Sequence, residues 1–215
     1  YFSTPFNVVY TRSVQDPDYG VRATGRNGQH TYGFFAAQDS VLQVLIPGSL
    51  GSRFTNAQEI DSLAVAGRYR FDINNKTSIG LISTLRSGDE YQNTVVGIDG
   101  RWQTKGHTLT AQWLTSDSEN IAAFNPSFPE PPLPQKQQGD AYTVSYDFSN
   151  RNWGAYASHT SFDEGFRADL GFIGQVDFNK SVIGGSHTWH GKDNTKITKV
   201  RLNGDWDITH RSDGQ

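Results

Sequence analysis

The sequence predicts an all-β protein built from consecutive antiparallel hairpins. Many segments alternate apolar and polar residues at every second position, which is the pattern of a β-strand. Turn residues such as Asn27-Gly28 separate these segments, and Asn-Gly strongly favours a hairpin. No segment keeps an apolar period of about 3.6 residues for three turns, as an amphipathic helix would. We expect roughly eleven or twelve strands, each about 9 residues or longer.

The alternating segments follow one another along the whole chain. They are VRATGR (21–26), TYGFFAAQ (31–38), LAVAGRYRF (63–71), TSIGLISTLR (77–86), NTVVGIDGRW (93–102), HTLTAQWLTS (107–116), AYTVSYDF (141–148), WGAYASHT (153–160), FRADLGFIGQVDFNK (166–180), SVIGGSHTWH (181–190) and TKITKVRLNGDWDI (195–208).

Two kinds of connection separate the expected strands. Some are tight, at Asn74-Asn75, 104–106 and Ser149-Asn150, whereas a Pro-rich stretch at about 117–138 and residues 48–60 form long polar loops. Proline cannot donate to a strand ladder, so the Pro-rich stretch is not a central strand. Short turns at one end and long loops at the other are typical of outer-membrane barrels.

Segment 166–180 raises the question of which face of the sheet lies inside. As a strand it would carry Leu170, Phe172 and Val176 on one face and Arg167 and Asp169 on the other. A soluble sandwich or lipocalin-like barrel would bury the apolar face. A membrane barrel would turn that face to lipid and the charged face to an aqueous lumen.

Composition narrows the class of protein. Hydrophobic residues make up only 35% of the 215 residues, and aromatic residues make up 13%, so the chain is poor in ordinary core aliphatics. The net charge of −3 gives no electrostatic case for nucleic-acid binding. Absence of cysteine excludes disulfides and thiolate metal sites. No apolar run reaches the roughly 18 residues of a membrane helix.

Three features favour the membrane alternative: aromatics near strand ends, charges of both signs with many glycines on the polar face, and long strands. In this alternative we expect the chain to form an antiparallel up-and-down transmembrane β-barrel. The expected lumen-lining residues are Arg68, Arg70, Arg86, Asp99, Arg101, Arg167 and Asp169. The expected aromatic girdle is Tyr69, Phe71, Trp102, Tyr142, Phe148, Trp189 and Trp206.

Several segments also resemble a known family. STPFNVVYTRSV, VRATGRNGQHTYGFFAAQD, SIGLISTLRSGDEYQNTVVGIDGRW and FRADLGFIGQVDF are similar, in this order, to bacterial outer-membrane proteins. In that family a β-sandwich like carbohydrate-binding family nine precedes a large C-terminal barrel domain of unknown function. The most specific matching motif is Phe166-Arg167-Asp169-Gly171-Phe172.

The resemblance implies a Gram-negative outer-membrane location, in contact with outer-membrane lipid and lipopolysaccharide. It implies that residues 1–215 are part of a larger barrel domain, assembled by the general barrel-insertion machinery. The family offers no established reaction, so no catalytic residue, metal or cofactor follows from it.

The expected function is therefore a channel, or a membrane anchor for a glycan-binding domain, and not an enzyme. The arginines could form a basic strip favouring anionic solutes, or could be salt-bridged lumen filling. The alternative is a soluble sandwich or barrel that binds carbohydrate through Trp153, Trp189 and Trp206. A third possibility, an outer-membrane hydrolase, lacks a nucleophile elbow, and Ser186 and His187 would point to opposite faces.

Overall fold

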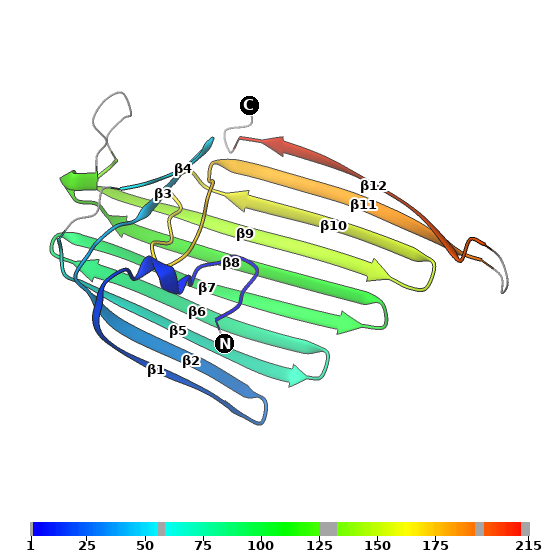
Figure 1. Cartoon of the computed structure of the whole chain (residues 1–215), viewed down its shortest axis with the longest axis horizontal. Helices are drawn as coiled ribbons and strands as arrows, with labels where there is room; N and C mark the ends of the chain where they lie inside the picture. Colours follow the sequence, from blue (N-terminus) through cyan, green and yellow to red (C-terminus); the bar gives the residue numbers. More distant parts are fainter. Residues whose placement is uncertain (1, 56–58, 125–132, 192–195, 212–215) are drawn as a thin grey trace.

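The computed structural model contains one broad antiparallel sheet (Figure 1). It describes residues 2–55, 59–124, 133–191 and 196–211. Ten strands form the sheet in the order β1-β2-β5-β6-β7-β8-β9-β10-β11-β12, and β3 pairs with β4 in a separate hairpin. The predicted all-β class and the hairpin order are confirmed. The described residues form no closed barrel, because β1 and β12 are the two edges of the sheet.

The strands and short helices have these bounds: η1 (Thr11–Ser13), β1 (Pro17–Asn27), β2 (His30–Asp39), β3 (Leu45–Gly48), β4 (Gly51–Phe54), β5 (Ser62–Asn74), β6 (Thr77–Gly88), β7 (Tyr91–Thr104), β8 (His107–Glu119), η2 (Ala122–Phe124), β9 (Lys136–Ser149), β10 (Trp153–Phe162), β11 (Phe178–His190) and β12 (Lys199–His210).

The two ends of the strands differ in their connections. At one end, here called the turn end, short turns join β1 to β2, β5 to β6, β7 to β8 and β9 to β10. Gly28 and Gly106 have φ of 57° and 74° there, which explains glycine at those turns. The opposite loop end carries the connections 40–61, 120–135 and 163–177, and one tight turn at Asp89-Glu90.

Within the described residues, the segments that cover the sheet lie on one of its faces. Residues 2–16, 40–47 and 163–177 pack against what we call the inner face, and the opposite face is the outer face. Tyr10 N–H donates to Leu170 O at 2.6 Å, and Phe172 N–H donates to Asn7 O at 2.8 Å. These bonds join two of the covering segments into one layer, seen crossing the strands in Figure 1.

The hydrophobic core lies between this covering layer and the inner face. Val8, Phe166 and Val176 from the layer pack with Ile82, Val95 and Leu114 from β6, β7 and β8. A second cluster joins Leu42, Val44 and Ile46 to Tyr91 and Phe124 near the loop end. The core therefore occupies the loop half of the inner face.

The prediction of a strand over 166–180 is wrong for residues 166–177. These residues form turns and irregular backbone, and β11 begins at Phe178. Leu170 and Val176 are buried, but so are Arg167 and Asp169, because both kinds of side chain sit between the layer and the sheet. Phe172 is half exposed. The alternation of apolar and polar residues here belongs to an irregular segment that is packed on the inner face, and not to a strand with one buried and one exposed face.

Two loops also differ from expectation. The expected loop at 48–60 is part of a longer connection that contains the β3–β4 hairpin. The Pro-rich connection is narrower than 117–138, because β8 extends to Glu119 and β9 starts at Lys136. Residues 125–132 of that stretch lie outside the described residues.

Candidate functional site

The outer face carries a continuous band of exposed apolar side chains, here called the outer band. Strand register brings these residues from every strand of the sheet to the same face. Ile98, at the middle of β7, is 53% exposed, and Trp206 on β12 is 61% exposed. Its larger members are Val21, Tyr32, Phe34, Tyr69, Ile79, Leu81, Val96, Ile98, Trp102, Leu109, Trp113, Tyr142, Val144, Tyr146, Trp153, Ile183, Trp189, Val200, Leu202, Trp206 and Ile208.

Polar residues bound the outer band at the loop end. On β8 the outward positions change from Trp113 to Asp117 and Glu119, and Lys136 of β9 forms an ion pair with Glu119. Asp117 accepts a hydrogen bond from Gln138 of β9. On these two strands the apolar surface thus stops at a charged rim, one or two outward positions beyond Trp113.

Aromatic and histidine rings bound the band at the turn end. His30 and Tyr69 share a hydrogen bond of 2.7 Å, and His107 and Tyr146 share an equivalent bond of 2.7 Å on later strands. His187 packs against Trp153, with ring centroids 4.1 Å apart. The ring partner of each of these histidines comes from a neighbouring strand of the sheet. The rings combine an apolar body with a satisfied polar edge.

The predicted girdle residues all lie on the outer face. Tyr69, Phe71, Trp102, Phe148 and Trp189 are near the turn end. Tyr142 lies next to Trp113, nearer the loop end, and Trp206 of β12 also lies away from the turn end. Their contact with a membrane stays a prediction.

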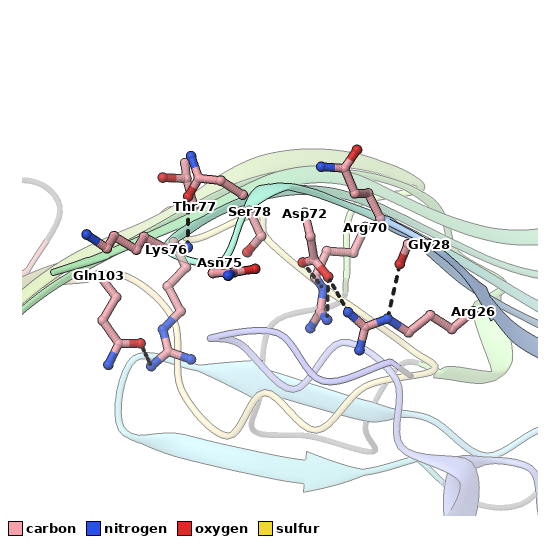
Figure 2. Close-up of a pocket in the computed structure, with 12 residues that line it drawn as sticks. Arg26, Gly28, Arg70, Asp72, Asn75, Lys76, Thr77, Ser78 and Gln103 are labelled. Carbon is pink, nitrogen blue, oxygen red and sulfur yellow. Dashed lines mark hydrogen bonds and ion pairs between the residues drawn. The ribbon is translucent and has the colours of Figure 1, made fainter.

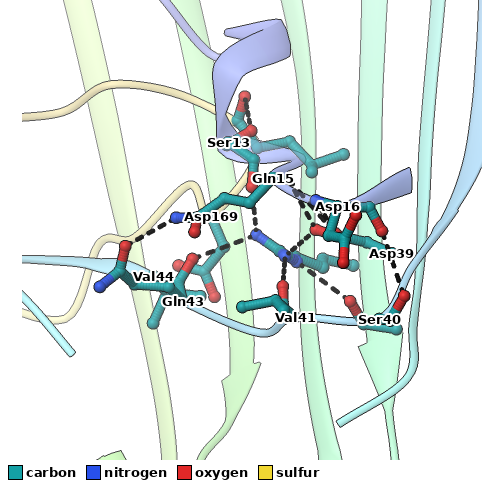
Figure 3. Close-up of polar contacts among 12 residues, drawn as sticks. Ser13, Gln15, Asp16, Asp39, Ser40, Val41, Gln43, Val44 and Asp169 are labelled. Atoms are coloured by element: carbon teal, nitrogen blue, oxygen red, sulfur yellow. Dashed lines mark hydrogen bonds and ion pairs between the residues drawn. The ribbon is translucent and has the colours of Figure 1, made fainter. Parts of the chain in front are cut away.

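The inner face holds a fully buried ion pair at the loop end. Arg86 of β6 donates from Nη2 to Asp39 Oδ2 of β2 at 2.7 Å, and both side chains are 0% exposed (Figure 3). Arg86 also donates to the backbone oxygens of Ser13 at 2.9 Å and Gln43 at 3.3 Å. Asp39 accepts from the backbone N–H of Asp16 at 2.8 Å. The pair therefore fastens two covering segments to the sheet.

A second buried pair fastens residues 163–177. Arg167 Nε lies 2.8 Å from Asp169 Oδ1 in an ion pair, again with both side chains 0% exposed. Tyr91 of β7 donates its hydroxyl to the same carboxylate. Asn93, two residues along β7, donates to Arg167 O at 3.1 Å and accepts from Asp169 N–H at 2.9 Å. The motif that begins at Phe166 therefore lies in a segment that docks onto β7.

A third pair lies nearer the middle of the strands. Arg68 of β5 forms an ion pair with Asp99 of β7 across the intervening strand β6, and its Nη2 donates to Asp99 Oδ1 at 2.8 Å. Gly80 of β6 leaves the space for it, because a Cβ there would lie 2.7 Å from Arg68 Cζ. Three of the five predicted arginines are therefore buried and each paired with one carboxylate.

The remaining predicted arginines lie together near the turn end. Arg70 and Arg101 line a recess of about 470 Å³ with Arg26, Asp72 and Lys76 (Figure 2). Sequence reasoning missed Arg26, Asp72 and Lys76 as site residues. Asp72 shares the inward alternation phase with Arg70 on β5, and Arg26 has the inward phase on β1, so phase alone could have found both.

The structure adds two negative findings and the comparisons a third. Among the described ranges, no group of three or more His, Cys, Asp or Glu side chains could hold a metal ion. No helix in the same residues has the length and apolar character to cross a bilayer. Comparison with protein-family models, curated proteins and solved structures finds no match for this chain.

Proposed function

We propose that this chain forms part of the wall of a transmembrane β-barrel in a bacterial outer membrane. The single observation that carries the proposal is the outer band: ten neighbouring strands present exposed apolar side chains on one face, and most charged side chains of the sheet lie on the other. Monomeric soluble proteins rarely expose apolar patches beyond a few hundred Å². Lipid would cover the band, with ring-bearing residues at the headgroup level.

The edges of the sheet support a larger barrel. β1 and β12 each leave one row of backbone N–H and C=O groups without a strand partner in the described sheet. In lipid each unsatisfied group costs several kcal/mol, so only closed strand pairing is viable. We propose that further strands of the same protein pair with β1 and β12.

Within this proposal, the inner layer favours an anchor over an open channel. The loop half of the inner face is filled by apolar side chains and by the Arg86–Asp39 and Arg167–Asp169 pairs. Solute flow along this wall would have to pass the filled half. A channel stays the second candidate because the turn half holds the open, charged recess.

Membrane association and electrophoresis test the proposed barrel. The expected result is that the chain stays with membranes until detergent is added, folds into phospholipid vesicles, and migrates faster before boiling than after it. A monomer that remains dispersed in detergent-free buffer would overturn the proposal and favour a soluble protein that binds carbohydrate through exposed aromatics.

Conductance of planar bilayers containing the folded protein separates the two versions. An anchor with a filled lumen gives no discrete current steps. Reproducible steps would instead support the channel.

A further inference from the structure

We propose that the recess at the turn end of the inner face binds an anionic solute with two or more acidic groups. We call it the arginine recess, lined by Arg26, Gly28, Gln29, Arg70, Asp72, Asn74, Asn75, Lys76, Thr77, Ser78, Arg101 and Gln103. Its volume of about 470 Å³ suits a ligand the size of a phosphorylated or carboxylated sugar. The inference deepens the proposed function, on which it depends for its location in the barrel.

Charge imbalance is the first argument. Four cationic side chains line the recess, and Asp72 is the one carboxylate among its lining residues. Asp72 Oδ2 accepts from Arg26 Nη2 at 3.1 Å, and Asp72 Oδ1 lies 3.1 Å from Arg70 Nε in an ion pair. A single carboxylate thus serves two guanidinium groups, and positive charge is left over in a chain whose net charge is −3. A charged concavity of this kind concentrates ions of opposite sign.

The available donors are the second argument. Arg101 donates from Nη2 to Gln103 Oε1 at 3.1 Å, a neutral partner. In the part of the chain that the structure describes, no carboxylate pairs with Arg101 or Lys76. Both side chains are on exposed residues, so they reach a solute without breaking an existing ion pair. Guanidinium groups bind phosphate and carboxylate bidentately, which favours Arg101 as the main anchor.

Register explains why these groups converge. On the inner face Asp72 of β5 lies opposite Ser78 of β6, and Ser78 lies opposite Arg101 of β7. Arg70 lies one inward position further from the turn, opposite Thr31 of β2, and Thr31 lies opposite Arg26 of β1. Figure 2 shows Arg26, Asp72 and Gln103 on the same side of the arching sheet. Three strands, β1, β5 and β7, and the turn that holds Lys76 thus bring their charges to one space.

The position of the recess in the proposed barrel indicates the side from which a ligand would enter. Short turns of outer-membrane barrels face the periplasm. The recess adjoins the turns at 28–29 and 75–76, whereas the filled half of the inner face adjoins the loop end. An anion would therefore enter from the periplasmic side and stop at the filled half, which makes the recess a binding site and not a path.

Calorimetric titration of the full chain with inorganic pyrophosphate, in zwitterionic detergent at low salt, tests the proposal. We expect saturable binding that weakens as salt rises to about 0.15 M. The double variant Lys76→Gln/Arg101→Gln should bind at least about tenfold more weakly, because two charged donors are lost. Asp72→Asn should bind more tightly, since it removes the competing carboxylate.

Arg22→Gln is the matched control. Arg22 lies on the inner face of β1, four residues before Arg26, and outside the recess. It should change affinity less than twofold. Absence of pyrophosphate binding, or equal losses in Arg22→Gln and the double variant, would overturn the proposal. The titration needs no bilayer, so it can fail independently of the barrel. Pyrophosphate binding without insertion into vesicles would contradict only the proposed barrel. Insertion without binding would contradict only the proposed anion site.

Discussion

Single residues on the inner face have two roles, and burial separates them. Arg68, Arg86 and Arg167 are each buried against a carboxylate, and Arg70 and Arg101 lie where water reaches them. Desolvating two charges costs about as much as their attraction returns, so the buried pairs add little net stability over apolar packing. Two of them, Arg86–Asp39 and Arg167–Asp169, also hold the covering segments to the sheet through hydrogen bonds.

Removing one partner of a buried pair should be far more costly than removing an exposed charge. Arg86→Met leaves Asp39 charged and buried, which typically costs about 3–5 kcal/mol of unfolding free energy. The exposed Arg22→Met should cost about 0.5 kcal/mol or less. Urea unfolding followed by tryptophan fluorescence measures both.

The double variant Arg86→Met/Asp39→Leu tests the reason for that loss. We expect it to recover a large part of the stability lost in Arg86→Met, because no buried charge is left unpaired. A double variant that loses the sum of both single losses would contradict this account.

Alternation in the sequence predicts the face of a residue but not its depth or partner. It placed Arg86 and Asp99 on the polar side of their strands, and the structure puts both on the inner face. Asp39, the partner of Arg86, is 47 positions away in the chain. The two are brought together because β2 pairs with β5 across the β3–β4 insertion, which no local pattern reports.

At the scale of elements, residues 163–177 show where period-two reasoning fails. Alternation predicts a strand only when one face is buried and the other is not. Here both sets are buried: Leu170 in the covering layer, and Arg167 with Asp169 in an ion pair that also contacts Tyr91. The same pattern therefore appears without a strand, and the specific Phe-Arg-Asp-Gly-Phe motif reports docking contacts.

Gly171 lies where residues 163–177 meet the other covering segment, and replacing it should weaken this contact. A Cβ at Gly171 would lie 2.6 Å from Asn7 O and 2.8 Å from Val8 Cα, both backbone atoms of the other covering segment. Gly171→Ala should therefore destabilise the fold by about 1–3 kcal/mol, as overpacking does. Urea unfolding gives the loss, and limited proteolysis shows whether residues 2–16 become accessible.

Gly174→Ala is the matched control, because a Cβ at Gly174 would meet no atom within 4 Å. We expect little change in stability or in proteolysis. Similar losses in the two variants would show that the close approach at Gly171 does not hold the two segments together.

For the whole molecule, the proposal depends on whether the outer band is more stable in contact with lipid than in contact with water. A soluble protein would leave the exposed parts of Ile98, Trp113 and Trp206 in water, where each forgoes part of the about 1.5–3 kcal/mol that full burial of a large apolar side chain supplies. In a bilayer the same side chains are covered, and the polar rim at Asp117 and Glu119 marks where lipid would end. The two surroundings give opposite expectations for a charge placed in the band.

Ile98→Arg puts that difference to the test. Ile98 lies midway along β7, between Trp102 at the turn end and the polar rim, and its side chain points outward. Arginine at the midplane of a lipid face costs about 2–4 kcal/mol, whereas at a position that is 53% exposed to water it costs little. Gln92→Arg, on the outer face of the same strand opposite Glu119, is the control and should cost about 1 kcal/mol or less. Reversible urea unfolding from phospholipid vesicles measures both, and equal small effects would mean that the outer band does not face lipid.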